Sequence, residues 1–239
     1  MSKRTTTTTG TPMAIATTTT EALYRLAAWL SPAYPIGAFS YSHGVEYAVE
    51  AGLVTDRDSL AGWVAHIVRH GAAWCDAVLI AHAHGAAAAG DHAALEEVAA
   101  LALALRGSAE MALETAQPGA AFVATTRAAW DVAALARFAG RPVALPVAFA
   151  VAAAGVVPKR LAVAAYLQAF AANLVSAGVR LVPLGQTDGQ RAVAALLPVV
   201  EAAADDAVAM PLEDVGAAAP MVDWTSMQHE TQYTRLFRS

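Results

Sequence analysis

Apolar side chains recur every three or four residues along most of this chain, the spacing of one face of an α-helix. The clearest stripe lies between residues 58 and 89 and comprises Leu60, Val64, Ile67, Val68, Trp74, Val78 and Leu79. Proline, glycine and capping residues divide the pattern into segments. We therefore predict helices at about 21–30, 41–51, 58–89, 91–106, 108–138, 146–155, 158–181 and 187–210.

Capping and helix-breaking residues set these boundaries. Thr20 is expected to cap the first helix, and Thr187 with Gln190 to form a capping box for the last. Pro118 and Pro198 are expected to bend or break the helices that contain them. No alternation typical of paired strands and no internal repeat is found. The prediction is an all-α, single-domain bundle of about eight to ten helices.

The two ends of the chain differ from its middle. Residues 1–19 are rich in threonine and are predicted to be a disordered leader; no apolar stretch follows its basic residues, so a signal peptide is not expected. Residues 20–215 form the predicted helical domain. From 216 the periodicity weakens, and residues 216–239 are predicted to be a mobile tail that binds a partner.

One segment is long and apolar enough to raise the question of a membrane. Residues 161–179 carry no charge over a length that could span a bilayer. However, Gln168, Asn173, Ser176 and Gly178 interrupt this run, and much of the rest is alanine. A buried helix at the centre of a helical domain is the preferred interpretation, and a small membrane protein is the alternative.

Composition narrows the function. The apolar set makes up 57% of the chain and charged residues only 15%, and the abundant alanine favours close-packed helices. A net charge of −5 gives no basic surface for nucleic acid. The single cysteine, Cys75, excludes an internal disulfide framework and suits a reducing cytoplasm.

Catalytic and nucleotide-binding patterns are missing. The segment around Ser40 lacks the second glycine of a nucleophile elbow, and the glycines near Gln186 lack the lysine and Ser/Thr of a phosphate loop. Glu110 and Glu114 share a helix face, where they are expected to form a solvated cluster with Arg106. We therefore expect no catalytic residue and no bound nucleotide.

An alternative function is that of an α-helical metal-dependent hydrolase that uses histidines as metal ligands. Its ligands would come from His43, His66, His70, His82, His84 and His229. His66 and His70 lie one helical turn apart, but the glutamate of a zinc protease motif is absent and the cationic Arg69 disfavours a metal ion. The histidines are expected to be surface or packing residues, with no tightly bound metal.

Two polar regions are better candidates for function. The junction GVRLVPLGQTDGQR at 178–191 gathers charged and amide side chains directly after the uncharged helix. The segment HETQYTRLFRS at 229–239 combines arginines with aromatic and aliphatic residues, the types that dominate binding hot spots. The chemistry of this tail equally allows it to pack on its own domain.

These two segments closely resemble the urease accessory protein F family, UreF. The resemblance extends to LSPAYPIGAFSYSHGVE at 30–46, PVAF at 146–149, YLQAF at 166–170 and NLVS at 173–176. It covers about 21–239. The departures are small, because the family commonly has glutamine where His43 stands and serine where Thr234 stands.

The resemblance implies a cytoplasmic, homodimeric, non-enzymatic protein that binds neither nucleic acid nor membranes. It would bridge the accessory protein UreD (UreH in some organisms) and the GTPase UreG, and would modulate the GTPase. The assembly would deliver nickel to apo-urease, with no cofactor held by this chain. The implied GTPase-binding residues are Arg180, Gln186, Asp188, Gln190 and Arg191. The implied UreD-binding residues are Pro35, Phe39, Tyr41, His229, Glu230, Gln232, Tyr233, Arg235, Leu236, Phe237 and Arg238.

Overall fold

The structure of the chain is a computed structural model that describes residues 18–239. Within this range the regular elements are helical and no strand occurs. They are α1 (Thr20–Trp29), η1 (Ala38–Ser40), α2 (Val45–Glu50), α3 (Arg57–His70), α4 (Ala72–Ala89), α5 (His92–Ala104), α6 (Ala109–Ala129), η2 (Ala133–Phe138), α7 (Leu145–Ala153), α8 (Lys159–Leu181), α9 (Gln186–Ala195), α10 (Leu197–Ala209), η3 (Leu212–Asp214) and α11 (Pro220–His229). The predicted all-α class is confirmed, and the predicted leader lies almost entirely outside the described residues.

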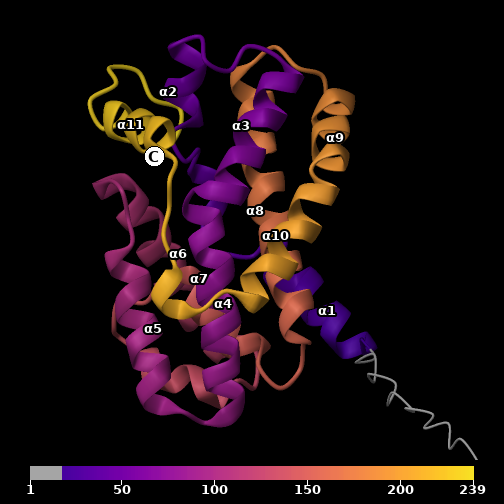
Figure 1. Cartoon of the computed structure of the whole chain (residues 1–239), viewed down its shortest axis with the longest axis vertical. Helices are drawn as coiled ribbons and strands as arrows, with labels where there is room; N and C mark the ends of the chain where they lie inside the picture. Colours follow the sequence, from indigo (N-terminus) through magenta and orange to yellow (C-terminus); the bar gives the residue numbers. More distant parts are fainter. Residues whose placement is uncertain (1–17) are drawn as a thin grey trace, which may run out of the picture.

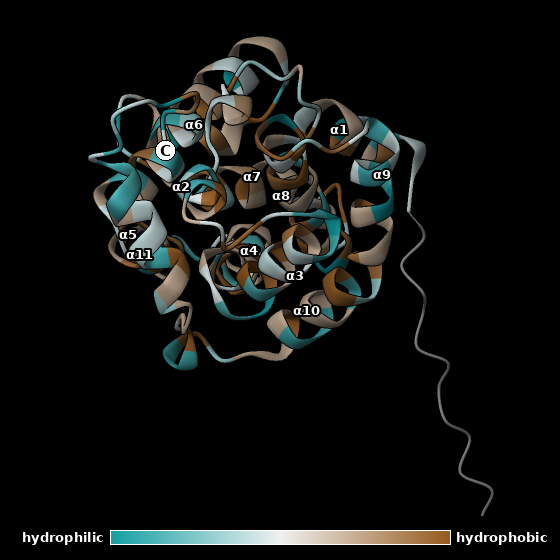
Figure 2. Ribbon diagram, turned by 90° about the horizontal axis from the view of Figure 1, so that it is seen from above, coloured by the Kyte–Doolittle hydropathy of each residue, from teal (hydrophilic) through white to brown (hydrophobic). Residues whose placement is uncertain are grey.

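Three helices form the centre of the bundle. Viewed along the long axis, α4, α7 and α8 lie inside a ring of the other helices (Figure 2). α7 packs against α4 and α6, and α8 packs against α4 and α10. Every residue from Pro146 to Ala153 in α7 is buried. Alanine on these helices lets their backbones approach closely, which explains the composition.

Glycine allows two of the closest approaches. A Cβ atom on Gly119, in the middle of α6, would lie 2.0 Å from the carbonyl oxygen of Val143. A Cβ on Gly178 of α8 would lie 2.5 Å from both Leu60 methyl carbons. Pro118, expected to bend or break its helix, does not break it: α6 runs continuously from Ala109 to Ala129.

Several helix boundaries differ from the prediction. Thr19, not Thr20, caps α1 by accepting a hydrogen bond from the amide of Ala22. The predicted capping box at Thr187 is wrong, because α9 already begins at Gln186, with Gly185 as its N-cap and no side-chain cap. At Pro198 a new helix begins, with proline in the first turn, where its missing N–H needs no partner.

Helix α8, which contains the uncharged run 161–179, is long and apolar enough to cross a membrane by length and composition. Half of its apolar window is buried inside the protein, where it contacts α2, α3, α4, α9 and α10. This packing is that of the central helix of a bundle, as the sequence predicts.

Helix α11 and the tail lie at one end of the molecule, beside α2, and α9 lies on the opposite side of α3 (Figure 1). α11 contacts α2 and α6. The chain then passes from His229 across the segment 38–42. This end therefore brings together residues that are about 190 positions apart in the sequence.

Candidate partner-binding site

The last residues of the chain form hydrogen bonds with the loop before α2. The amide of Arg238 donates to the carbonyl of Ser40 (2.8 Å), and the amide and hydroxyl of Ser42 both donate to the carbonyl of Ser239 (2.6 Å each). Phe237 and Ser239 are buried. The prediction of a mobile tail is therefore wrong: main-chain hydrogen bonds and a buried aromatic ring fix it to the domain.

Glu46, in the first turn of α2, anchors the same segment. Its carboxylate accepts hydrogen bonds from the amides of Leu236 (2.6 Å) and Phe237 (2.9 Å), and Nε2 of His229 lies 3.0 Å from it. Hydrogen bonds to a charged acceptor are stronger than neutral ones. A buried carboxylate also needs such partners, because leaving it unpaired would be costly. Glu46 therefore fixes the path of the tail.

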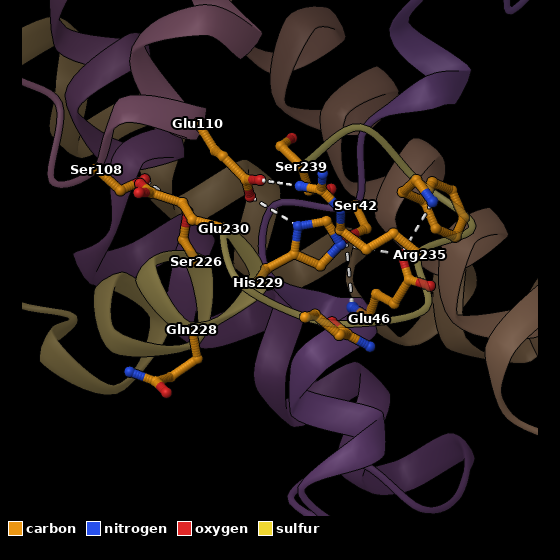
Figure 3. Close-up of polar contacts among 12 residues, drawn as sticks. Ser42, Glu46, Ser108, Glu110, Ser226, Gln228, His229, Glu230, Arg235 and Ser239 are labelled. Carbon is orange, nitrogen blue, oxygen red and sulfur yellow. Dashed lines mark hydrogen bonds and ion pairs between the residues drawn. The ribbon is translucent and has the colours of Figure 1, made fainter.

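His229 lies between two carboxylates and is completely buried (Figure 3). Its Nδ1 is 2.7 Å from Glu110, opposite the contact of Nε2 with Glu46. Both ring nitrogens can donate only in the protonated imidazole, so this geometry requires a proton on both nitrogens or on one carboxyl group. Burial raises the pKa of Glu110, against the opposing effects of His229 and Arg235.

Arg235 completes this buried polar cluster, which consists of Glu46, Glu110, His229 and Arg235. Its Nη1 donates to Glu110 at 3.1 Å, while part of the side chain remains exposed. Glu110 is thus contacted by the imidazole of His229 and by the guanidinium of Arg235, both from the C-terminal segment. These contacts make the tail an integral part of the domain.

Arg180 lies against the opposite side of the tail. Its guanidinium carbon is 4.4 Å from the centroid of the Phe237 ring, and its Nη2 donates to the carbonyl of Phe39 at 3.2 Å. Its Nε donates to Ser176 on its own helix. The side chain is nonetheless exposed. Arg180 therefore joins the end of α8, the loop and the tail.

The loop at 34–42, before α2, covers a cavity of about 390 Å³ between α6 and α8. Its wall includes a buried ion pair, in which Arg106 donates to Asp76 at 2.8 Å, and Tyr166 donates to the same carboxylate. Two buried polar atoms on its lining, Nε2 of His43 and Oγ1 of Thr115, have no protein partner. The loop is therefore not tightly packed against the core beneath it.

Comparisons with known proteins identify the family. A family model described as UreF matches residues 54–197. The curated urease accessory protein UreF of Granulibacter bethesdensis is 57% identical over 222 residues, which cover 91% of this chain and 94% of that protein. The protein of the same name from Rhodopseudomonas palustris (strain HaA2) is 52% identical over 91% of this chain and 93% of its own length.

The chain belongs to the UreF family. It is thus a urease accessory protein and not an enzyme. The UreF protein of Methylobacterium sp. (strain 4-46) is also 52% identical, over 90% of this chain and 87% of its own length. The resemblance found in the sequence motifs is confirmed.

The residues expected to bind UreD divide into two groups in this UreF-family structure. Phe39, Tyr233 and Leu236 are exposed, with Tyr233 fully exposed and Leu236 65% exposed. The other exposed or partly exposed members are Pro35, Glu230, Gln232, Arg235 and Arg238. The remaining three, Tyr41, His229 and Phe237, are buried and act as internal contacts.

The residues expected to bind the GTPase are spread over two helices. Gln186, Asp188, Gln190 and Arg191 belong to α9, where Asp188 and Arg191 form an ion pair at 2.9 Å. α9 packs on α8 and α3, but the Arg180 guanidinium turns away from it, towards Phe39 and Phe237. The role of all five in GTPase binding stays a prediction.

The histidines of the alternative function are not gathered into one site. His82 and His84 contact the carbonyls of Met210 and Val157, and His43 pairs with Glu114. Within residues 18–239, no group of three or more His, Cys, Asp or Glu side chains has a metal-binding arrangement. The ligand set that the hydrolase would need is therefore not assembled there.

The structural roles of Glu46 and Glu110 do not follow from the sequence pattern. Helical spacing predicts a solvated cluster of Glu110 with Glu114 and Arg106, but Glu110 pairs with His229 and Arg235. Glu114 instead contacts His43, and Arg106 is paired with Asp76. The only signal for Glu46 is its place at the end of the 30–46 motif. Such long-range pairs cannot be read from helical spacing.

Proposed function

We propose that this chain is a cytoplasmic, homodimeric scaffold that bridges UreD (UreH) and the GTPase UreG during nickel insertion into apo-urease. The observation that carries the proposal is the joining of the loop, the tail and Arg180 at one end of the bundle. Nickel is the cargo of the assembled complex. The nucleotide is bound by the GTPase.

The UreD-facing surface consists of Phe39, Tyr233 and Leu236 together with the outer side of α11. Met221, Trp224 and Met227 recur every three residues on that helix and are each 41–49% exposed. Buried hydrogen bonds hold the backbone beneath Leu236 in place. A partner would therefore meet a preformed apolar surface, which lowers the entropic cost of binding. The cavity below the loop leaves space for Phe39 to adjust.

The GTPase-facing surface consists of Arg180 and the exposed face of α9. Arg180, Gln190 and Arg191 are exposed, and a guanidinium suits recognition of carboxylate groups on a partner. The ion pair of Arg191 with Asp188 is at the surface, so its rearrangement on binding would cost little.

Pull-down experiments with purified UreD-like and UreG-like proteins test this assignment. The double variant Tyr233→Ala with Leu236→Ala removes exposed apolar area without touching the buried polar cluster. We expect it to lose UreD capture and retain UreG capture. The matched control is Leu197→Ala on α10, whose side chain is 61% exposed. Full UreD binding by the double variant, or an equal loss in the control, would overturn the assignment.

A further inference from the structure

His66 and His70 occupy the last turn of α3 and are both exposed. Their ring centroids are 5.1 Å apart, with an angle of 53° between the ring planes. Within the described part of the chain, no hydrogen bond or ion pair occupies either imidazole. His43, His82, His84, His92 and His229 each contact another group. The pair therefore has nitrogen lone pairs available to a ligand.

We propose that His66 and His70 form a binding site for a divalent late transition-metal ion. Two imidazoles bound to one ion at about 2.1 Å, with an angle near 100° at the metal, have ring centroids roughly 5 Å apart. The observed separation is close to that value. The site goes beyond the proposed bridging function and lies outside the loop, the tail and Arg180.

Charges near the pair act on a cation in opposite directions. The last turn of an α-helix carries a partial negative charge. His70 is the final residue of α3, but its carbonyl already accepts a hydrogen bond from Ala218 and α4 begins at Ala72, so this attraction is weak. The positive charge of the neighbouring Arg69 would repel a bound cation. It is exposed, so water and salt screen its repulsion.

The ligand chemistry selects the class of ion. Imidazole suits nickel, copper and zinc, whereas magnesium and calcium prefer oxygen ligands. Two protein ligands leave the other coordination positions to water. Binding is therefore reversible, and the ion remains exchangeable with ligands from solvent or from another protein. This is the behaviour of a temporary site rather than a structural one.

Calorimetric titration of the untagged, full-length protein with Ni²⁺ tests the proposal, with Mg²⁺ as the control ion. We expect one Ni²⁺ per chain at this site, and no competition from Mg²⁺. His66→Ala and His70→Ala should each weaken this binding by about tenfold or more, because each leaves a single imidazole. His92→Ala, which removes an exposed histidine on α5, should leave it unchanged.

NMR spectra of the histidine side chains give a second measurement of Ni²⁺ binding. Substoichiometric Ni²⁺ should broaden the imidazole signals of His66 and His70 together, before those of His92. Both substitutions lie on an exposed face, so thermal unfolding should match that of the unsubstituted protein. Unchanged Ni²⁺ affinity in both folded variants, or broadening of His92 before the pair, would overturn the site.

Discussion

The guanidinium of Arg180 lies over the ring of Phe237, 4.4 Å from its centroid. A cation over an aromatic face is attracted by the ring quadrupole. This contact connects the end of α8, where a GTPase-binding residue is expected, to a tail expected to serve a different partner. Substitution of either residue therefore tests two surfaces, and controls must separate them.

Charge reversal at Arg180 should weaken GTPase binding. Arg180→Glu places a carboxylate where the partner is expected to present acidic groups, so affinity should fall by about two orders of magnitude. The substitution also removes the contacts with Phe237 and Phe39. Phe237→Leu is the matched control, because it removes the ring contact and keeps the cation. Equal losses of GTPase affinity in both variants would assign the effect to the tail instead.

Removal of residues 229–239 should destabilise the protein. The sequence alone predicts no change in stability, but the structure buries Phe237 and anchors the tail on Glu46. Burial of one phenylalanine contributes about 1.5–3 kcal/mol, so the Tm should fall by at least about 3 °C. Tyr233→Ala removes a fully exposed side chain and should leave the Tm unchanged. An unaltered Tm in the truncated protein would support the mobile tail.

His229→Ala should be more damaging than the loss of one buried side chain. It leaves Glu46 and Glu110 facing each other without the intervening imidazole, and removing one partner of a buried ion pair costs about 3–5 kcal/mol. Adding Glu110→Gln should recover part of that loss, because the excess negative charge is then removed. Denaturant unfolding of the single and double variants measures this coupling. Strictly additive losses would show that the charge of the cluster does not matter.

The sequence predicts the helices well and the contacts of the tail poorly, for a physical reason. Helical periodicity, proline positions and alanine content are local, and they correctly identify α8 as a central helix and 108–138 as mainly helical. The environment of His229 depends on Glu46, which lies 183 positions away. No local pattern distinguishes a histidine that will be enclosed by carboxylates from one on a surface.

In the candidate partner-binding site, too, the sequence predicts which segments matter but not how their side chains pack. The family motifs assign the loop and the tail to one partner and Arg180 to another, whereas in the structure Arg180 contacts both Phe39 of the loop and Phe237 of the tail. They do not indicate that Tyr41 and Phe237 are buried while Tyr233 is exposed. Buried and exposed side chains alternate in the last four residues of the chain. Which set is buried depends on the contact with Glu46, which is distant in the sequence.

Gly119→Ala should destabilise the bundle strongly. The added methyl group would meet the carbonyl oxygen of Val143 at 2.0 Å, so α6 must move away from the segment that leads into α7. Overpacking of this kind costs about 1–3 kcal/mol or more. Gly62→Ala is the matched control, since nothing lies within 4 Å of its added methyl group and alanine favours the helix. Its free energy of unfolding should rise by about 0.5–1 kcal/mol in the same denaturant experiment.

Cys75 should resist alkylation in the folded protein. Burial, with a smaller contribution from the charge of Asp76, raises the pKa of its thiol to about 11. The thiolate is the reactive form, so at pH 8 only about one molecule in a thousand carries it. Because the pKa is raised on folding, the folded state favours the neutral thiol.

The rate of Cys75 alkylation by iodoacetamide should therefore rise about tenfold per pH unit up to that pKa. The urea-unfolded chain, in which the thiol has its ordinary pKa, should react far faster at pH 8. Equal rates in the folded and unfolded protein would show that Cys75 is accessible and that α4 opens readily.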